Sequence, residues 1–230
     1  MNARTSAFLA LAVLLAALFI RLGVWQLDRL AERRTVIERT RAMLAAPDVP
    51  FTSLRSDTLR ANRRTIVEGV PDYDHEFVHT GRSRNGSPGV HILTPVRIGE
   101  TTAVLVNRGW VYAGDAASVD LSRWRESRGT FRGYTREMAP GALTGQVGPS
   151  GVRVLTRGAL REFVPYPVDS VYVIARDSSA DRAPARLPEP DLSNGPHLSY
   201  AIQWFCFAAI ALTGAGIVFA RARRPHRPTE

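Results

Sequence analysis

Two long apolar segments lie near the ends of the chain and enclose a polar middle. Residues 7–20 carry no charge, and the apolar pattern continues beyond Arg21. Residues 7–27 would form about 31 Å of helix, which is enough to cross a bilayer. Residues 198–220 also carry no charge, and arginines follow them directly. Each segment therefore predicts a transmembrane helix, with Arg21 near an interface where its long side chain can reach water.

The first apolar segment has an alternative interpretation as a cleaved signal peptide, with Arg4 as its charged region. The small residues of a cleavage site should then follow, but residues 21–25 (RLGVW) do not provide them. We therefore expect an uncleaved anchor, with Trp25 in the aromatic belt of the interface. Two spans put both termini on one side of the membrane, and the arginine counts leave that side open.

The polar middle begins with a helical pattern and contains one strong strand. The helical pattern extends the first span over residues 28–46 and ends at Pro47. The best strand covers residues 101–112, with a continuous apolar run at 103–106 that predicts burial. Gly99, which precedes this strand, predicts a tight hairpin.

The remaining patterns are shorter strands and loops. Pro95 predicts an edge or broken strand over residues 90–98, because proline cannot donate to a ladder. Residues 139–151 are a loop rich in glycine and proline, and residues 178–196 are a stiff, proline-rich linker. Further strand patterns occur at 65–67, 77–78, 131–134 and 171–175.

Together these patterns predict a membrane protein with two transmembrane α-helices that flank a β-rich (α+β) domain. Short strands with few long helices favour a small barrel or sandwich for that domain. The expected parts, in chain order, are an N-terminus (1–6), the first span (7–27), the β-rich domain (28–177), the linker (178–196), the second span (197–220) and a basic tail (221–230).

Composition removes several classes of function. The formal charge is +9, but the 30 basic residues, all arginine, are spread along the chain without an aromatic-rich RNA-binding signature. We therefore expect no nucleic-acid partner. Cys206 is the single cysteine, which excludes an intramolecular disulfide and a multi-cysteine metal site. No nucleophile elbow, His-Glu-x-x-His helix or phosphate loop is present, so the sequence does not support a hydrolase and names no catalytic residue.

One cluster of candidate metal ligands lies in the middle of the chain, at Asp72, Asp74, His75, Glu76 and His79. Its oxygen and nitrogen donors could hold zinc or copper, and a membrane-anchored metalloenzyme using Asp74, His75 and His79 is one hypothesis. The same composition is typical of a polar turn that enters a strand.

Two further positions could carry chemistry. Arg108, near the end of the best strand, could clamp a carboxylate with its guanidinium fork. Alternatively, the glycine and tryptophan that follow it mark a strand bend with a ring packed over it. His197 begins the second span and shares a helical face with Tyr200 and Trp204. An imidazole with an aromatic wall suits axial ligation of haem iron, although an interfacial histidine can also simply face lipid headgroups.

Three blocks of the sequence, in order, resemble the surfeit locus protein 1 family of cytochrome oxidase assembly factors. The first is LGVWQLDR at residues 22–29. The second is LTP at 93–95, followed by VLVNRGWV at 104–111, and the third is HLSYAIQWF at 197–205. Their order and placement around the two spans make the resemblance specific, and it covers essentially the whole chain.

The resemblance implies a role, a location and partners. It implies a non-enzymatic factor, with cytoplasmic termini and an extracytoplasmic domain, that binds haem a and presents it to oxidase subunit one. Other oxidase assembly factors and the lipid bilayer are the further expected partners. The chain begins almost at its span, which favours a bacterial cytoplasmic membrane over a mitochondrial one. A scaffold that holds an oxidase assembly intermediate without binding haem is the alternative.

The resemblance also implies a haem site. In the family, the histidine of the third block is a proposed haem ligand, and here it is His197. We add the hypothesis that aromatic side chains wall the ring, the first span closes the site, and an arginine reaches a propionate. The residues expected at the haem besides this ligand are Tyr200, Trp204, Trp25, Gln26 and Arg108.

Overall fold

The structure is a computed structural model, and it divides into two compact units. Residues 1–39 with 191–230 form a helical unit, and residues 40–190 form a β domain. The described residues are 2–54, 61–114, 119–127, 129–141, 147, 150–177 and 183–223. Parts of the predicted 139–151 loop, the 178–196 linker and the 221–230 tail therefore lie outside them.

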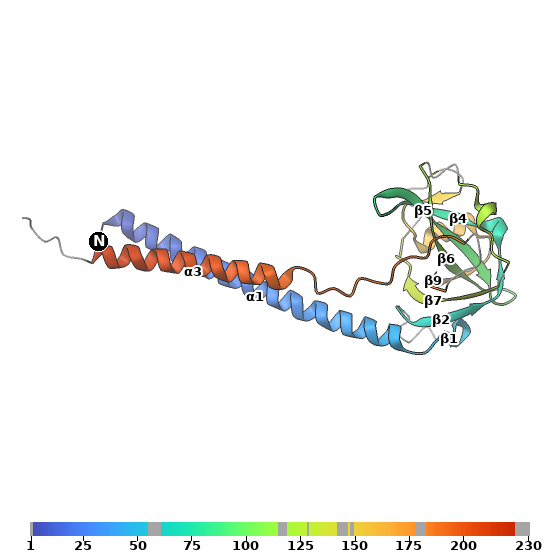
Figure 1. The fold of residues 1–230 in the computed structure, drawn as a ribbon, viewed down its shortest axis with the longest axis horizontal. Coiled ribbons are helices and arrows are strands. Elements are labelled where there is room, and N and C mark those ends of the chain that lie inside the picture. Colours follow the sequence, from blue (N-terminus) through green and yellow to red (C-terminus); the bar gives the residue numbers. More distant parts are fainter. Residues whose placement is uncertain are drawn as a thin grey trace, which may run out of the picture. The chain divides into compact units, whose positions relative to one another are not determined.

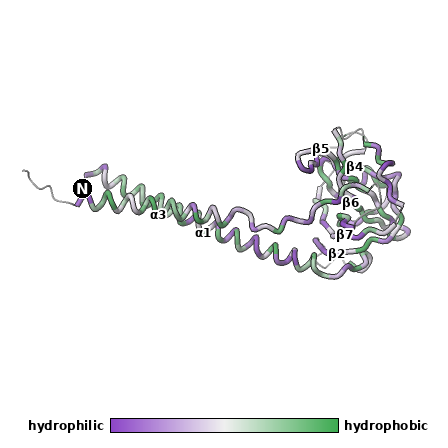
Figure 2. Tube along the Cα trace, in the orientation of Figure 1, coloured by the Kyte–Doolittle hydropathy of each residue, from purple (hydrophilic) through white to green (hydrophobic). Residues whose placement is uncertain are grey.

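The helical unit contains α1 (Ala3–Ala45) and α3 (His197–Ala222), which lie side by side (Figure 1). Both are long and apolar enough to cross a membrane. The hydrophobic colour of α3 and of the first part of α1 gives way to hydrophilic residues in the second part of α1 (Figure 2). The structure therefore confirms two apolar helices that flank a β domain, and the predicted helical extension beyond the first span.

Small side chains line the contact between the two helices. Gly23 of α1 lies against the ring of Phe205, and a Cβ at this glycine would come within 2.6 Å of that ring. Gly214 and Gly216, by contrast, have open space around them and take no part in the seam. Close approach through small residues is the usual way in which apolar helices pack inside a bilayer. The buried alanines of the seam are Ala12, Ala16, Ala201, Ala208 and Ala215.

The β domain is built on one mixed sheet. Its hydrogen-bonded order is β1-β2-β7-β9-β6-β5-β4-β8, and β3 pairs with β5. The strands are β1 (Val49–Pro50), β2 (Arg64–Glu68), β3 (Val70–Pro71), β4 (Phe77–Arg84), β5 (Ser87–Arg97), β6 (Ala103–Tyr112), β7 (Thr130–Glu137), β8 (Gly151–Val152) and β9 (Val168–Ala175).

The sheet curls round so that strands from different parts of its order meet at Gly69. Of the two predicted forms, barrel and sandwich, this closure gives the barrel. Strand β2 pairs with β7 and β3 pairs with β5, yet only Gly69 separates β2 from β3 along the chain. The chain therefore passes from β2 to the side of β5, and these two strands are four places apart in the sheet order. At this junction the Gly69 amide donates to the carbonyl of Gly129, and a Cβ at residue 69 would overlap the carbonyl oxygen of Arg97.

This close approach predicts a large effect of Gly69→Ala on the stability of the β domain. The added methyl group must push two backbones apart, and overpacking of this kind costs about 1–3 kcal/mol. Gly99→Ala is the matched control, because a Cβ at residue 99 meets nothing within 4 Å. Urea unfolding of the full chain in detergent, followed by circular dichroism, would measure both. Equal stabilities of the two variants would contradict the closure described here.

Strand β6 lies between two apolar cores. Val104 and Val106 point into one cluster, whereas Leu105 points into another on the opposite face. The second cluster includes Ala159 and Leu160 from the short helix α2 (Arg157–Phe163). The predicted buried strand and its hairpin to β5 are confirmed, while α2 and β8 had no recognised pattern in the sequence.

The prediction of an edge or broken strand at Pro95 is wrong, because β5 is continuous from Ser87 to Arg97. Strand β5 is an inner strand, with β6 along one side and β4 and β3 on the other. Pro95 falls between the end of the β4 pairing at Leu93 and the start of the β3 pairing at Val96. Its carbonyl accepts from the amide of Asp72, so its nitrogen faces this gap as well. The missing N–H therefore breaks no ladder hydrogen bond.

Candidate functional site

The start of α3 carries the strongest candidate site. The Nδ1 atom of His197 lies 2.9 Å from the Oε1 atom of Gln26 on α1. An amide oxygen only accepts, so the imidazole carries its proton on Nδ1 and keeps the lone pair of Nε2 free. Gly195 leaves the space beside Nε2 open, since a Cβ there would lie 3.7 Å from this atom. This arrangement is the usual one for a metal-binding histidine, whose second nitrogen donates to a fixed acceptor.

The chain just before α3 is held by an arginine of α1 that sequence reasoning did not assign. Arg33 donates from Nε to the carbonyl of Ser193 at 3.1 Å and from a terminal nitrogen to the carbonyl of Asp191 at 2.9 Å. The Asp191 carboxylate in turn accepts from the amide and hydroxyl of Ser193. These bonds fix the chain four residues before His197. A basic residue in this part of α1 was visible in the sequence, but its backbone partners were not.

The other expected haem contacts of the helical unit are distributed along both helices. Trp204 stacks on Phe19 of α1 with ring centres 5.7 Å apart, and Phe207 packs against both rings. Trp25 and Tyr200 have exposed side chains, 43% and 46% accessible. The structure thus joins His197 to Gln26 and gives Trp204 its own aromatic partners.

Arg108 occupies a β-bulge in the β domain. In the ladder between β5 and β6, Ile92 pairs with Gly109 and Leu93 pairs with Asn107, so Arg108 is the extra residue. Gly109 has a φ of +132°, which favours glycine. The bulge turns the Arg108 side chain into the interior, where it is fully buried. The predicted bend is therefore confirmed, but no ring of a described residue packs over Gly109, which lies against the backbone of Ala185, while the Trp110 ring lies against Gly89.

Arg108 is bonded on all sides to internal groups. Its guanidinium donates to the carboxylate of Glu76, to the hydroxyl of Thr94 at 2.7 Å and to the carbonyl of Trp124. The carboxylate of Glu126 lies 3.5 Å away, and the ring of Tyr73 lies 5.3 Å from the guanidinium carbon. A haem propionate would have to displace these groups to reach Arg108.

Glu76 depends on this arginine for its charge. Burial raises the pKa of Glu76, and the guanidinium of Arg108 opposes that effect. One carboxylate oxygen of Glu76 is buried without a hydrogen-bond partner among the described residues. Glu76, Glu126 and Arg108 therefore form a buried charge network (called the Arg108 network below) that sequence reasoning missed, because its members are far apart in the chain.

Residues 185 and 186, which follow β9, are hydrogen-bonded to β6 and to the Arg108 network. Ala185 and Trp110 exchange two backbone hydrogen bonds, of 2.8 and 2.9 Å, in an isolated bridge. Arg186 donates to the carbonyl of Arg108 and contacts the carboxylate of Glu126 at 3.2 Å. The described part of the predicted linker is therefore fastened to the β domain at these residues.

The candidate metal ligands around residues 72–79 include a hydrogen-bonded turn, which was the alternative interpretation. Asp72 accepts from His75 at 2.9 Å and from the hydroxyl of Tyr166 at 2.5 Å. Burial opposes ionisation, but these bonds hold the pKa of Asp72 below its usual range. His79 lies apart from them, 3.2 Å from the carbonyl of Arg153. Within the described residues no three His, Cys, Asp or Glu side chains are grouped as a metal site, which favours the turn.

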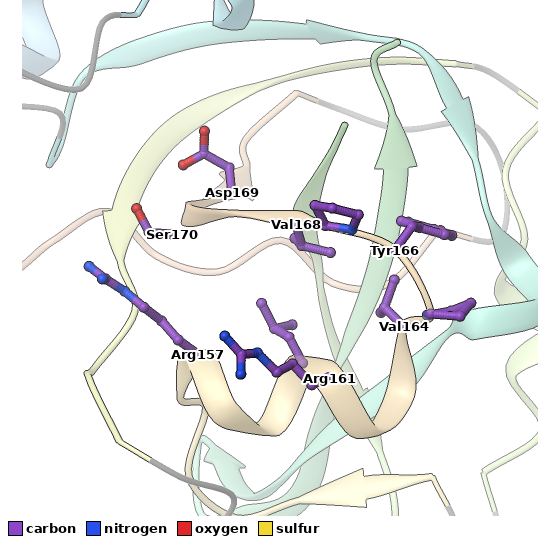
Figure 3. A pocket seen from close by; sticks show the side chains of 10 residues that line it. Arg157, Arg161, Val164, Tyr166, Val168, Asp169 and Ser170 are labelled. Carbon is purple, nitrogen blue, oxygen red and sulfur yellow. The ribbon is translucent and has the colours of Figure 1, made fainter. Parts of the chain in front are cut away.

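A pocket of about 510 Å³ opens between α2 and the start of β9. Figure 3 shows Arg157 and Arg161 extending from α2 on one side, with Asp169 and Ser170 on the other. None of the expected haem contacts lines it. It therefore adds no residue to the site at α3.

These features define a membrane-anchored α+β protein in which two apolar helices flank a small barrel and pair through a histidine and a glutamine. The chain belongs to the SURF1 family, which matches residues 13–209. The family is linked to the assembly of cytochrome oxidase. The resemblance in the three sequence blocks is thereby confirmed.

Individual relatives agree with this assignment over part of their length. The chain is 29% identical over 94 residues to a SURF1-like protein of Rickettsia felis, which is 40% of this chain and 41% of the relative. It is 25% identical over 93 residues to a SURF1-like protein of Rickettsia bellii, which is 40% of this chain and 39% of the relative. The chain thus spans about two fifths of the length of these curated relatives.

Proposed function

We propose that this protein is an assembly factor for haem–copper cytochrome oxidase that binds haem a through His197 and presents it to oxidase subunit one. The observation that carries the proposal is the hydrogen bond from His197 Nδ1 to Gln26, which leaves Nε2 as a lone-pair donor. Membership of the SURF1 family supports the link to the oxidase. Subunit one and other assembly factors are its proposed partners.

Haem a would be a cargo and not a resident cofactor. Its iron would accept the lone pair of Nε2, and the exposed rings of Trp25 and Tyr200 offer flat apolar surface for the macrocycle. Gln26 fixes the tautomer of His197, and Arg33 fixes the chain that leads into it. A single protein ligand suits a carrier, because cargo must be released. We further propose that the protein lies in a bacterial cytoplasmic membrane, with both termini in the cytoplasm and the β domain outside.

The visible absorption spectrum tests this proposal. The full chain is produced together with haem a synthesis, purified in detergent and compared with His197→Ala. We expect a haem a band that is lost in the variant. If neither protein carries haem while His197→Ala still supports oxidase maturation, the carrier function is excluded and the scaffold alternative takes its place. A band that survives the substitution would remove His197 as the ligand.

Gln26→Leu is expected to weaken haem a binding about 10–100-fold, as loss of an outer partner of a ligating histidine commonly does. The physical reason is that His197 loses the acceptor that fixes its tautomer and ring orientation. Gln203→Leu is the matched control, because Gln203 is an exposed glutamine of α3. Titration of haem a into both purified variants would measure the difference. Equal affinities would contradict the assigned role of Gln26.

A further inference from the structure

A second pocket, of about 540 Å³, lies in the β domain beside the β4–β5 hairpin. Arg82 and Arg84 line it from β4, His91 and Trp110 line it from β5 and β6, and Leu187 closes it. None of the residues that line this pocket, which we call the hairpin pocket, is an aspartate or a glutamate. No function proposed above uses it.

The hairpin pocket offers several hydrogen-bond donors, beside Ser83, Asn85 and Tyr134, whose side chains can also accept. The amide oxygen of Asn107 accepts from the Gly109 N–H at 3.1 Å, so its nitrogen is the group that faces His91 Nδ1 at 3.3 Å. An amide nitrogen only donates, so His91 keeps its proton on Nε2 and is itself a donor there. Trp110 holds a buried Nε1–H without an acceptor among the described residues. This nitrogen packs against Gly89 inside the wall, so the donors that the pocket offers are those of His91 and the two arginines.

The positive charge of the hairpin pocket has no internal counterpart. Arg82 and Arg84 are both half-buried. Among the described residues, the Arg82 side chain donates to the backbone carbonyls of Thr80 and Arg153, and neither arginine forms an ion pair there. Arginine forks and N–H donors suit the oxygens of a carboxylate or a phosphate.

The remaining wall is apolar and held in place. The rings of Trp110 and Tyr134 and the side chain of Leu187 contribute to it. The Nε1 and Cε2 atoms of Trp110 lie against Gly89, since a Cβ at residue 89 would overlap them. Leu187 follows directly on the bridge from Ala185 to Trp110 and on Arg186, which is bonded to the Arg108 network. The wall is therefore largely pre-formed, as in most small-molecule sites.

We propose that the hairpin pocket binds a small amphipathic anion. Its carboxylate or phosphate group would accept from Arg82, Arg84 and the Nε2–H group of His91. Its aromatic or apolar body would lie against Trp110 and Tyr134. This site is separate from His197 and goes beyond the proposed haem function, so either can fail without the other.

Isothermal titration calorimetry on the full chain in phosphatidylcholine nanodiscs tests the hairpin pocket, with empty nanodiscs subtracted. The probes are 2-naphthoate, 2-naphthyl phosphate and the neutral 2-naphthamide. We expect one molecule of at least one anion to bind per chain and the amide to bind about 10-fold more weakly or not at all. The two anions distinguish a carboxylate ligand from a phosphate ligand. Binding of neither anion, or equal binding of the amide, would overturn the proposal.

Variants of the arginines locate the binding. Arg82→Gln with Arg84→Gln should raise the dissociation constant of the bound anion about 10-fold or more. Arg157→Gln with Arg161→Gln, which removes the same charge from the pocket of Figure 3, should change it less than about 2-fold. Arg84→Gln alone is the second test if the double variant does not fold, because the Arg84 side chain forms no hydrogen bond or ion pair with a described residue. An equal loss in both double variants would overturn the proposal.

Discussion

Arg108→Met is expected to destabilise the β domain by about 3–5 kcal/mol, the usual result of removing one partner from a buried ion pair. The side chains of Arg108 and Glu76 are 0% and 1% exposed. Without the guanidinium, Glu76 keeps its bond from Thr94 but loses the charge that opposes its burial. Urea unfolding of the full chain in detergent, followed by the circular dichroism of the sheet, measures the loss.

Two further variants test whether the loss of stability comes from the unpaired buried charge or from removing any arginine. Arg132→Met breaks an ion pair with Asp48 in which the Arg132 side chain is 58% exposed, and it should cost less than about 1 kcal/mol. In the double variant Arg108→Met with Glu76→Met, much of the stability should return, because neither charge is left alone. A double variant as unstable as the sum of the two single variants would show that the charges are not coupled.

The sequence predicted the parts of the fold whose signal is local. The uncharged run at 198–220 sufficed for α3, and the apolar run at 103–106 sufficed for the centre of β6. The position of β5 depended on its neighbours, and Pro95 suggested an edge because proline lacks a donor. Only the register showed that its nitrogen faces the gap between β4 and β3. The parallel pairing of β6 with β9 likewise joins segments that are far apart in the chain.

In the candidate site, too, the local features could be predicted from the sequence and the long-range contacts could not. His197 could be singled out from its place at the start of an apolar helix, but its acceptor lies 171 positions away in the sequence. Arg108 was noticed as a clamp for a carboxylate, and the carboxylate that it holds is an internal one, Glu76. A bulge is set by the pairing register, which no local pattern shows. The interior position of Arg108 therefore needed the structure.

Two histidines in and near the hairpin pocket should make the stability of the β domain depend on pH. Burial, with repulsion from Arg82, lowers the pKa of His79 to about 4. Burial, with repulsion from His79 and Arg82, lowers the pKa of His91 to about 4. Both values lie below the 6.5 of an ordinary histidine, so the unfolded chain binds protons in this range that the folded domain does not. The free energy of unfolding should therefore fall as the pH decreases from 6.5 to 4.

Each unit of pKa difference corresponds to about 1.4 kcal/mol of stability. Solvent screening at the half-buried rings reduces the sum for the two histidines. We therefore expect protonation of the pair to lower the free energy of unfolding by about 3 kcal/mol at pH 4. Glu76 changes the stability in the opposite direction, because its raised pKa lets the folded domain take up a proton before the unfolded chain does.

The experiment therefore compares the wild-type chain with the double variant His79→Gln, His91→Gln, because both proteins retain Glu76. Urea unfolding at several pH values should give a clearly flatter profile for the double variant. His79→Gln alone should lose more than half of the dependence, because it also removes the repulsion that lowers the pKa of His91. Parallel profiles for all three proteins would mean that the imidazoles take up protons equally well in the folded and unfolded chain.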